Sequence, residues 1–182
     1  MRKVSLYITG VLFGLYLAAT TASAQGVSTI GGNPVVERGN ADTGYGPFYL
    51  MDTNHPFTAD GHVNRWEIYA DATNPVQLVI YRQTGGVFEE VGRSTVVTPV
   101  KGYNLFTIET AIPVKAGDFV GAYMPAVGSI SDTVYGGCTS GSLDQPVLFS
   151  SSTSTAFAFS CWRVYSLRAY NEQNQNEKQN QQ

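Results

Sequence analysis

The strongest constraint on the fold is a series of short extended segments between Gly61 and Tyr123. They are rich in β-branched and aromatic residues, which suit a pleated, half-buried surface, and Gly, Pro, Asn or Asp bounds each one. The clearest segments span residues 63–70, 76–82, 103–109 and 118–123. With further short segments at 48–51, 87–92, 146–150, 156–160 and 162–170, they predict a single antiparallel β-sandwich. A jelly roll is the first expected topology and an immunoglobulin-like sandwich the second.

Alternation with a period of two predicts the buried face of each strand. Trp66 shares a face with Ile68 and Ala70, and we expect this face to lie in the core. The same alternation puts Tyr69 and Tyr81 on outer faces, where they are expected to lie near each other. In the closing segment 162–170, one face is expected to be buried and to carry Tyr165, Leu167 and Ala169.

Turn residues predict how the segments connect. Gly85 and Gly86 separate two extended segments, which indicates a tight hairpin. Pro113 cannot donate to a ladder, so we expect it on an edge strand or between strands. Residues 128–144 are mostly Gly, Ser, Thr and Asp and have the appearance of the longest irregular region. Long loops in compact domains often carry function.

The N-terminal sequence predicts export from the cell. Arg2 and Lys3 precede an apolar run over residues 4–19, and Ala22-Ser23-Ala24 is a small-x-small cleavage site. These features are typical of a signal peptide over residues 1–24, whereas a membrane anchor would need a longer apolar run. We expect a flexible arm over 25–44 with an edge strand around 35–36, the sandwich domain over 45–170, and a disordered Gln/Asn-rich tail over 171–182.

Composition narrows the partners. The chain has 182 residues, of which 43% are apolar, enough for one core of ordinary size. Eleven Lys and Arg against 14 Asp and Glu give a formal charge of −3 without a basic cluster, so no nucleic-acid partner is expected. Cys138 and Cys161 are the only two cysteines. In an oxidising compartment they are expected to form a disulfide.

The sequence carries no catalytic signature. His55 and His62 are the only histidines, a G-x-S-x-G elbow is absent, and zinc has no ligand cluster at usable spacing. We therefore expect a protein that is not an enzyme. One alternative stays open, a glycoside hydrolase that uses two strand carboxylates. Its candidates are Glu67, Glu89, Glu90 and Glu109.

Calcium is the cofactor for which the sequence offers ligands. Carboxylate and amide oxygens in loops bind this ion, and candidate ligands are Asp52, Asn54, Asp132 and Asp144. EF-hand spacing is absent, and ordinary turn chemistry also explains Asp and Asn at these positions. We therefore expect no cofactor, with a structural calcium ion as the alternative.

Tyrosines provide the candidate ligand-binding residues. A sugar ring packs on a flat aromatic face and exchanges hydrogen bonds with neighbouring polar side chains. Tyr69, Tyr81, Tyr103 and Tyr135 are candidates by strand parity or loop position. The alternative is that these tyrosines only pack on an outer sheet face or under loops.

A resemblance to a known family lies mainly in core and turn positions within residues 60–70, 77–82, 91–92, 112–114, 116–121 and 165–170. By these positions the chain resembles, over residues 47–170, a secreted β-sandwich module of invertebrate extracellular proteins. The resemblance implies a coat, matrix or recognition role outside the cell and supplies no catalytic residues. Jelly-roll carbohydrate-binding modules are similar in broad architecture.

These features predict a secreted, non-enzymatic binding module whose partner is a glycan or a matrix component, without a membrane span. The alternative is a structural or adhesive matrix protein without a discrete pocket. In that case exposed tyrosines and the tail would mediate self-association.

Overall fold

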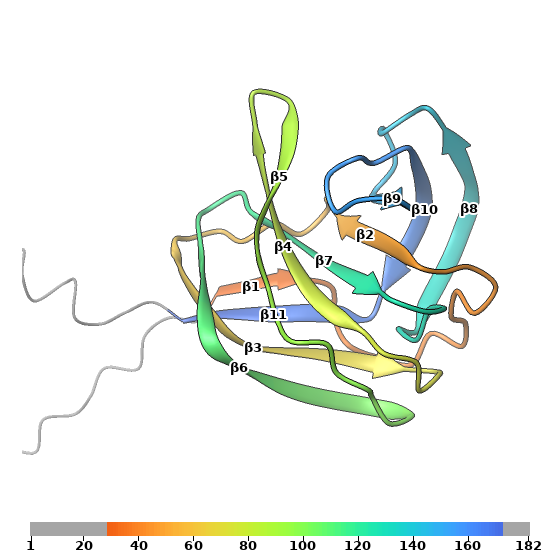
Figure 1. The fold of residues 1–182 in the computed structure, drawn as a ribbon, viewed down its shortest axis with the longest axis horizontal. Coiled ribbons are helices and arrows are strands. Elements are labelled where there is room, and N and C mark those ends of the chain that lie inside the picture. The colour runs from red at the N-terminus through yellow and green to blue at the C-terminus, as the bar shows by residue number, and fades with distance from the viewer. Residues whose placement is uncertain (1–28, 173–182) are drawn as a thin grey trace, which may run out of the picture.

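The computed structural model describes residues 29–172, which form two antiparallel β-sheets packed face to face (Figure 1). Within these residues there are eleven strands and no helix. The β-sandwich predicted from the sequence is confirmed. The strands are β1 (Thr29–Gly32), β2 (Phe48–Asp52), β3 (Gly61–Ala70), β4 (Gln77–Thr84), β5 (Val87–Arg93), β6 (Gly102–Val114), β7 (Phe119–Met124), β8 (Asp132–Ser140), β9 (Val147–Ser150), β10 (Phe159–Tyr165) and β11 (Leu167–Glu172).

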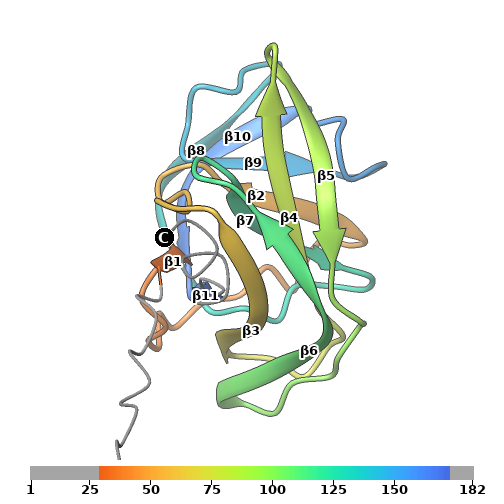
Figure 2. The same ribbon diagram turned by 90° about the vertical axis from the view of Figure 1, so that its left-hand side faces the viewer.

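The two sheets differ in size. The smaller sheet has the strand order β1-β11-β3-β6, and the larger has the order β5-β4-β7-β2-β9-β10-β8. The chain passes repeatedly from one sheet to the other, and the consecutive strands β8, β9 and β10 together extend one edge of the larger sheet. The β4–β5 hairpin projects at one end of the sandwich (Figures 1 and 2). Jelly-roll connectivity stays a prediction.

The core lies between the sheets and is built around Trp66. Trp66 and Ile68 are fully buried, and Ala70 is nearly so, which confirms the face predicted for β3. The Trp66 ring lies 4.7 Å from that of Phe106 on β6. Burial of a large aromatic ring stabilises the folded state several times as much as burial of one methylene group. This face of β3 therefore holds the smaller sheet against the larger one.

A second apolar cluster lies on the outer face of the larger sheet. It consists of Met51, Val79, Tyr81 and Leu148, with Phe88, Phe119, Tyr123 and Phe157 packed against it. Tyr81 is fully buried and its ring meets that of Phe157 at 5.4 Å. The expectation that Tyr81 lies near Tyr69 on an outer face is therefore wrong: the two tyrosines lie on different sheets, and Phe157 covers Tyr81.

The tight hairpin predicted at Gly85 and Gly86 is confirmed. Thr84 pairs with Val87, so Gly85 and Gly86 alone make the turn between β4 and β5, with φ angles of 59° and 85°. Positive φ at both positions is what a tight hairpin needs and what glycine adopts without strain. Pro113 lies on β6, the edge strand of the smaller sheet, as predicted.

Two regions differ from the sequence-based expectation. Residues 132–140 form β8 rather than a long irregular loop, and β8 pairs with β10. The expected closing strand 162–170 is divided at Ser166 into β10 in the larger sheet and β11 in the smaller one. Ser166 is fully buried, and its hydroxyl accepts a 2.8 Å hydrogen bond from Arg38 Nε.

The sandwich is longer at both ends than the predicted 45–170. In the expected flexible arm, β1 pairs with β11, while no strand forms at 35–36. At the other end, Asn171 and Glu172 belong to β11 rather than to the tail. The predicted signal peptide and residues 173–182 of the predicted tail lie outside the described residues. No helix able to cross a membrane occurs among residues 29–172.

Candidate functional site

The predicted disulfide is confirmed. Cys138 on β8 and Cys161 on β10 are bonded, with their Cα atoms 4.1 Å apart. The two cysteines face each other directly in the β8–β10 ladder. A bulge interrupts this ladder between Cys161 and Arg163, so the backbone pairing of β8 with β10 is not continuous. The disulfide therefore helps to fix the register of the edge strand β8 against the rest of the larger sheet.

The outer face of the smaller sheet carries a row of tyrosines and charged residues. We call it the tyrosine face and define it by Arg65, Glu67 and Tyr69 on β3, Tyr103 and Leu105 on β6, and Arg168 and Tyr170 on β11. Strand register brings them together, because Tyr69 pairs with Tyr103, Glu67 with Leu105 and Arg168, and Arg65 with Tyr170. Residues paired across a strand share one face, so these side chains form a continuous surface. Figure 2 shows β3 and β6 side by side.

Glu67 is the centre of the tyrosine face. Its carboxylate is almost fully buried and accepts hydrogen bonds from the Tyr103 hydroxyl at 2.5 Å, the Tyr170 hydroxyl at 2.8 Å and Arg168 Nε at 2.5 Å. Burial alone would raise the pKa of Glu67, but these three donors outweigh it and hold the pKa below its usual value. Glu67 is therefore ionised at neutral pH and holds three side chains from two neighbouring strands.

Tyr103 combines a fixed position with an exposed ring. The hydrogen bond to Glu67, followed by burial, raises the pKa of Tyr103 to about 12. Its side chain is nevertheless 55% exposed. An aromatic ring that is already held in one orientation loses little conformational entropy when a ligand packs on it.

The other tyrosines of this face are more covered. The guanidinium of Arg65 lies over the Tyr170 ring, 4.3 Å from its centroid, and the Arg168 guanidinium lies 5.3 Å from it. Tyr69 is half-buried and interacts with Glu37. The tyrosine face thus offers one open ring, Tyr103, which shares its partner Glu67 with the Arg168 guanidinium and the Tyr170 hydroxyl.

The four tyrosines predicted to bind a ligand do not form one site. Tyr69 and Tyr103 are cross-strand neighbours on the tyrosine face. Tyr81 is buried in the larger sheet and offers no ring surface, and Tyr135 is exposed on β8, an edge strand of the other sheet. The structure therefore leaves Tyr69 and Tyr103 as candidates for a shared site.

The four candidate calcium ligands are also dispersed. Asp52 is buried and bonded to the Asn33 amide, Asn54 is exposed, and Asp132 and Asp144 lie at opposite ends of the β8 region. Asp132 is fully buried, accepts a 2.9 Å hydrogen bond from Asn40 and lies 3.4 Å from Arg163. Among residues 29–172, no group of three or more His, Cys, Asp or Glu is placed to hold a metal ion.

Of the four strand carboxylates considered for hydrolysis, two are engaged in ion pairs and the other two, Glu89 and Glu109, are exposed. Glu67 contacts Arg168, and Glu90 contacts Arg93. Burial would raise the pKa of Glu90, but the bonds from Arg93 and Ser154 lower it below its usual value. A glycosidase acid needs a raised pKa to stay protonated, so Glu67 and Glu90 lack the property of a proton donor. Glu109 is exposed on β6.

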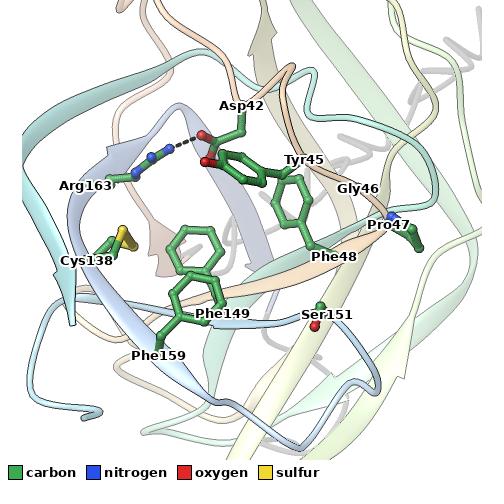
Figure 3. Close-up of a pocket in the computed structure, with 11 residues that line it drawn as sticks. Asp42, Tyr45, Gly46, Pro47, Phe48, Cys138, Phe149, Ser151, Phe159 and Arg163 are labelled. Atoms are coloured by element: carbon green, nitrogen blue, oxygen red, sulfur yellow. Dashed lines mark hydrogen bonds and ion pairs between the residues drawn. A yellow bond between two sulfur atoms is a disulfide. The ribbon is translucent and has the colours of Figure 1, made fainter. Parts of the chain in front are cut away.

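A pocket of about 490 Å³ is lined by residues within 42–48 and by side chains from β8, β9 and β10, with Ser151 after β9 (Figure 3). Its walls include Phe48, Phe149 and Phe159 and the Cys138–Cys161 disulfide. Asp42 and Arg163 form an ion pair in its lining. The Asp42 carboxylate also accepts a hydrogen bond from the buried Tyr165 hydroxyl.

Sequence reasoning missed several residues of the tyrosine face and all residues of the pocket as parts of a site. Arg168 and Tyr170 lie on the polar side of the last segment, and a signal was present, since alternation puts them on one face. Their meeting with Glu67 depends on the pairing of β11 with β3, which joins residues about a hundred positions apart. The pocket likewise joins residues 42–48 with 138–163, and no local motif links these segments.

Fold and surfaces define the class of the protein as a disulfide-bonded, all-β sandwich with an aromatic and charged outer face. No family model matches the chain, and neither a curated protein nor a solved structure matches it. The resemblance to secreted invertebrate modules stays a prediction.

Proposed function

We propose that the protein is a secreted, non-enzymatic binding module that recognises a glycan through the tyrosine face. The observation that carries the proposal is Tyr103, which Glu67 holds by its hydroxyl while more than half of the side chain stays exposed. A sugar ring packs its C–H groups on such a ring without a covalent step.

The charged neighbours of Tyr103 supply the polar half of sugar recognition. The side chain of Arg65 is 42% exposed and that of Arg168 is 27% exposed, so guanidinium N–H groups remain open to hydroxyl or carboxylate oxygens. Arginine presents several donors in a fixed plane, which suits recognition of adjacent oxygens. Arg168 is paired with Glu67 and Arg65 with Glu172, so the remaining guanidinium N–H donors, rather than a net positive charge, would bind the sugar oxygens.

Export supports the same role. The apolar N-terminal run with its cleavage site and the disulfide both fit an oxidising compartment outside the cell. A glycan or matrix component is a ligand met in that compartment. In this proposal the sandwich is a rigid scaffold, and calcium has no part in the tyrosine face.

The test is a glycan array with the full chain produced in a secreting host and recovered from the medium. We expect selective binding to a limited set of glycans, unchanged by chelation of calcium. Tyr103→Ala should weaken the selected binding at least tenfold, which corresponds to about 1.4 kcal/mol, because the ring provides the stacking surface.

Tyr135→Ala is the matched control. It removes the same side chain from an exposed strand position outside the tyrosine face, and its binding should equal that of the wild type. Absence of binding to every glycan, or equal loss in both variants, would contradict the proposal. Loss of binding on chelation would instead implicate the acidic loops predicted to hold calcium.

One observation favours a second candidate function, assembly with like chains in a matrix. Trp162 is 51% exposed on β10, and the neighbouring β8 is an edge strand with the exposed Tyr135. Exposed edge strands readily pair with another chain. An oligomer seen by light scattering, together with an array without binding, would favour this function.

A further inference from the structure

The pocket beside residues 42–48 has the size and lining of a small-molecule site and plays no part in the proposed glycan recognition. Its volume of about 490 Å³ falls within the roughly 300–1,000 Å³ of known ligand pockets. It opens beside Tyr45, which is 73% exposed. Figure 3 shows Tyr45 and Phe48 on one side of the space and the rings of Phe149 and Phe159 on the other.

The pocket walls favour a flat apolar molecule. The rings of Phe149 and Phe159 are stacked, 5.1 Å apart and 4° from parallel, and Phe48 lies 6.0 Å from Phe149. The disulfide sulfurs add a further apolar surface. The outer face of such a stacked pair is a single flat aromatic surface, which a planar ligand covers with little lost contact.

The polar end of the pocket selects against a net charge. Arg163 is already paired with Asp42, and Asp132 lies 3.4 Å from the same guanidinium nitrogen. Asp42 and Arg163, the charged residues of the pocket lining, neutralise each other. A bound anion and a bound cation would each lose water without an unpaired counter-charge to replace it. An uncharged molecule avoids both costs.

The same end has a spare donor. Arg163 Nε is buried and has no hydrogen-bond partner among the described residues, whereas the carboxylate oxygens of Asp42 are both bonded. Donors therefore exceed acceptors near the ion pair. This balance favours a ligand that carries an acceptor, such as a carbonyl or hydroxyl oxygen.

We propose that this pocket binds an uncharged, flat and largely apolar small molecule, with one carbonyl or hydroxyl oxygen placed toward the Asp42–Arg163 pair. The aromatic rings bind the body of the molecule and the ion pair orients its polar end. The site is separate from the tyrosine face, so either function can hold without the other.

Nile red is a suitable probe, since it is uncharged, flat and carries one carbonyl oxygen. Fluorescence titration of the full chain from the secreting host should show saturable binding of one dye per chain. 8-Anilinonaphthalene-1-sulfonate, a flat apolar anion, should bind at least tenfold more weakly. Equal affinity for the two dyes, more than one Nile red per chain, or no binding would overturn the proposal.

Ser151→Trp locates the binding. Ser151 lines the pocket and is exposed, so an indole can occupy the space without disturbing the core. Nile red affinity should fall at least tenfold, while Tyr135→Ala, outside the pocket, should leave it unchanged. Thermal unfolding of each variant reports whether the fold is kept. A folded Ser151→Trp protein that binds the dye as the wild type does would also overturn the proposal.

Discussion

Replacing Cys138 and Cys161 together by alanine should lower the free energy of unfolding by about 3 kcal/mol. The bond closes a loop of sequence separation 23 and so removes conformational freedom from the unfolded chain. It also fixes the edge strand β8, whose pairing with β10 is interrupted by a bulge. Chemical denaturation of the two proteins measures the difference.

Reduction provides the control for this prediction. Dithiothreitol should destabilise the wild-type protein to about the level of the double alanine variant and leave the variant itself unchanged. A loss well below 1 kcal/mol, or an equal response of both proteins to the reductant, would show that β8 is held without the bond. Cys161 is buried and Cys138 is exposed, so the variant opens only a small cavity.

Asp132→Asn should gain stability relative to the wild type as the pH rises. Asp132 is fully buried, and burial followed by the nearby Asp42 raises the pKa of Asp132 to about 6, against an unfolded value near 4. The folded state therefore holds a proton that the unfolded state has released between these pH values. Wild-type stability consequently falls as the pH rises through this window, whereas asparagine does not titrate.

The size of the effect follows from the shift. About two pKa units at roughly 1.4 kcal/mol each predict that the difference between variant and wild type grows by about 2 kcal/mol from pH 4 to pH 7.5, since part of the range lies below pH 4. Urea unfolding at several pH values measures this growth. Asp144→Asn, the same change at an exposed position, is the matched control. A difference for Asp132→Asn that stays constant with pH would contradict the burial argument.

The sequence predicted the fold where local patterns decide it. Alternation identified the core face of β3 around Trp66, and the Gly85-Gly86 pair identified the β4–β5 turn. It failed at Tyr81 because alternation assumes that one face of a strand is solvated. In β4 the run Leu78-Val79-Ile80-Tyr81 is continuously apolar, and such a run signals burial on both faces.

Non-local pairing explains most other differences. Residues 132–140 begin with the strand formers Thr133, Val134 and Tyr135, but two glycines then interrupt the pattern, so the full strand depends on pairing with β10 and on the disulfide. Ser166 carries no local signal that the chain leaves one sheet for the other. The same holds for Glu67, whose partners come from β6 and β11. Sequence reasoning found Tyr69 and Tyr103 but could not show what holds Tyr103 in place.

The central claim is that the tyrosine face is the glycan-binding surface, and a nitrogen-15 chemical-shift titration tests it most directly. The glycan selected on the array is added to the labelled protein, and the shifted backbone amides are mapped onto the fold. The account predicts that they cluster at residues 65–69, 103–107 and 168–170, on three neighbouring strands of the smaller sheet. Shifts confined to residues 42–48 and 149–163, around the pocket, would contradict it.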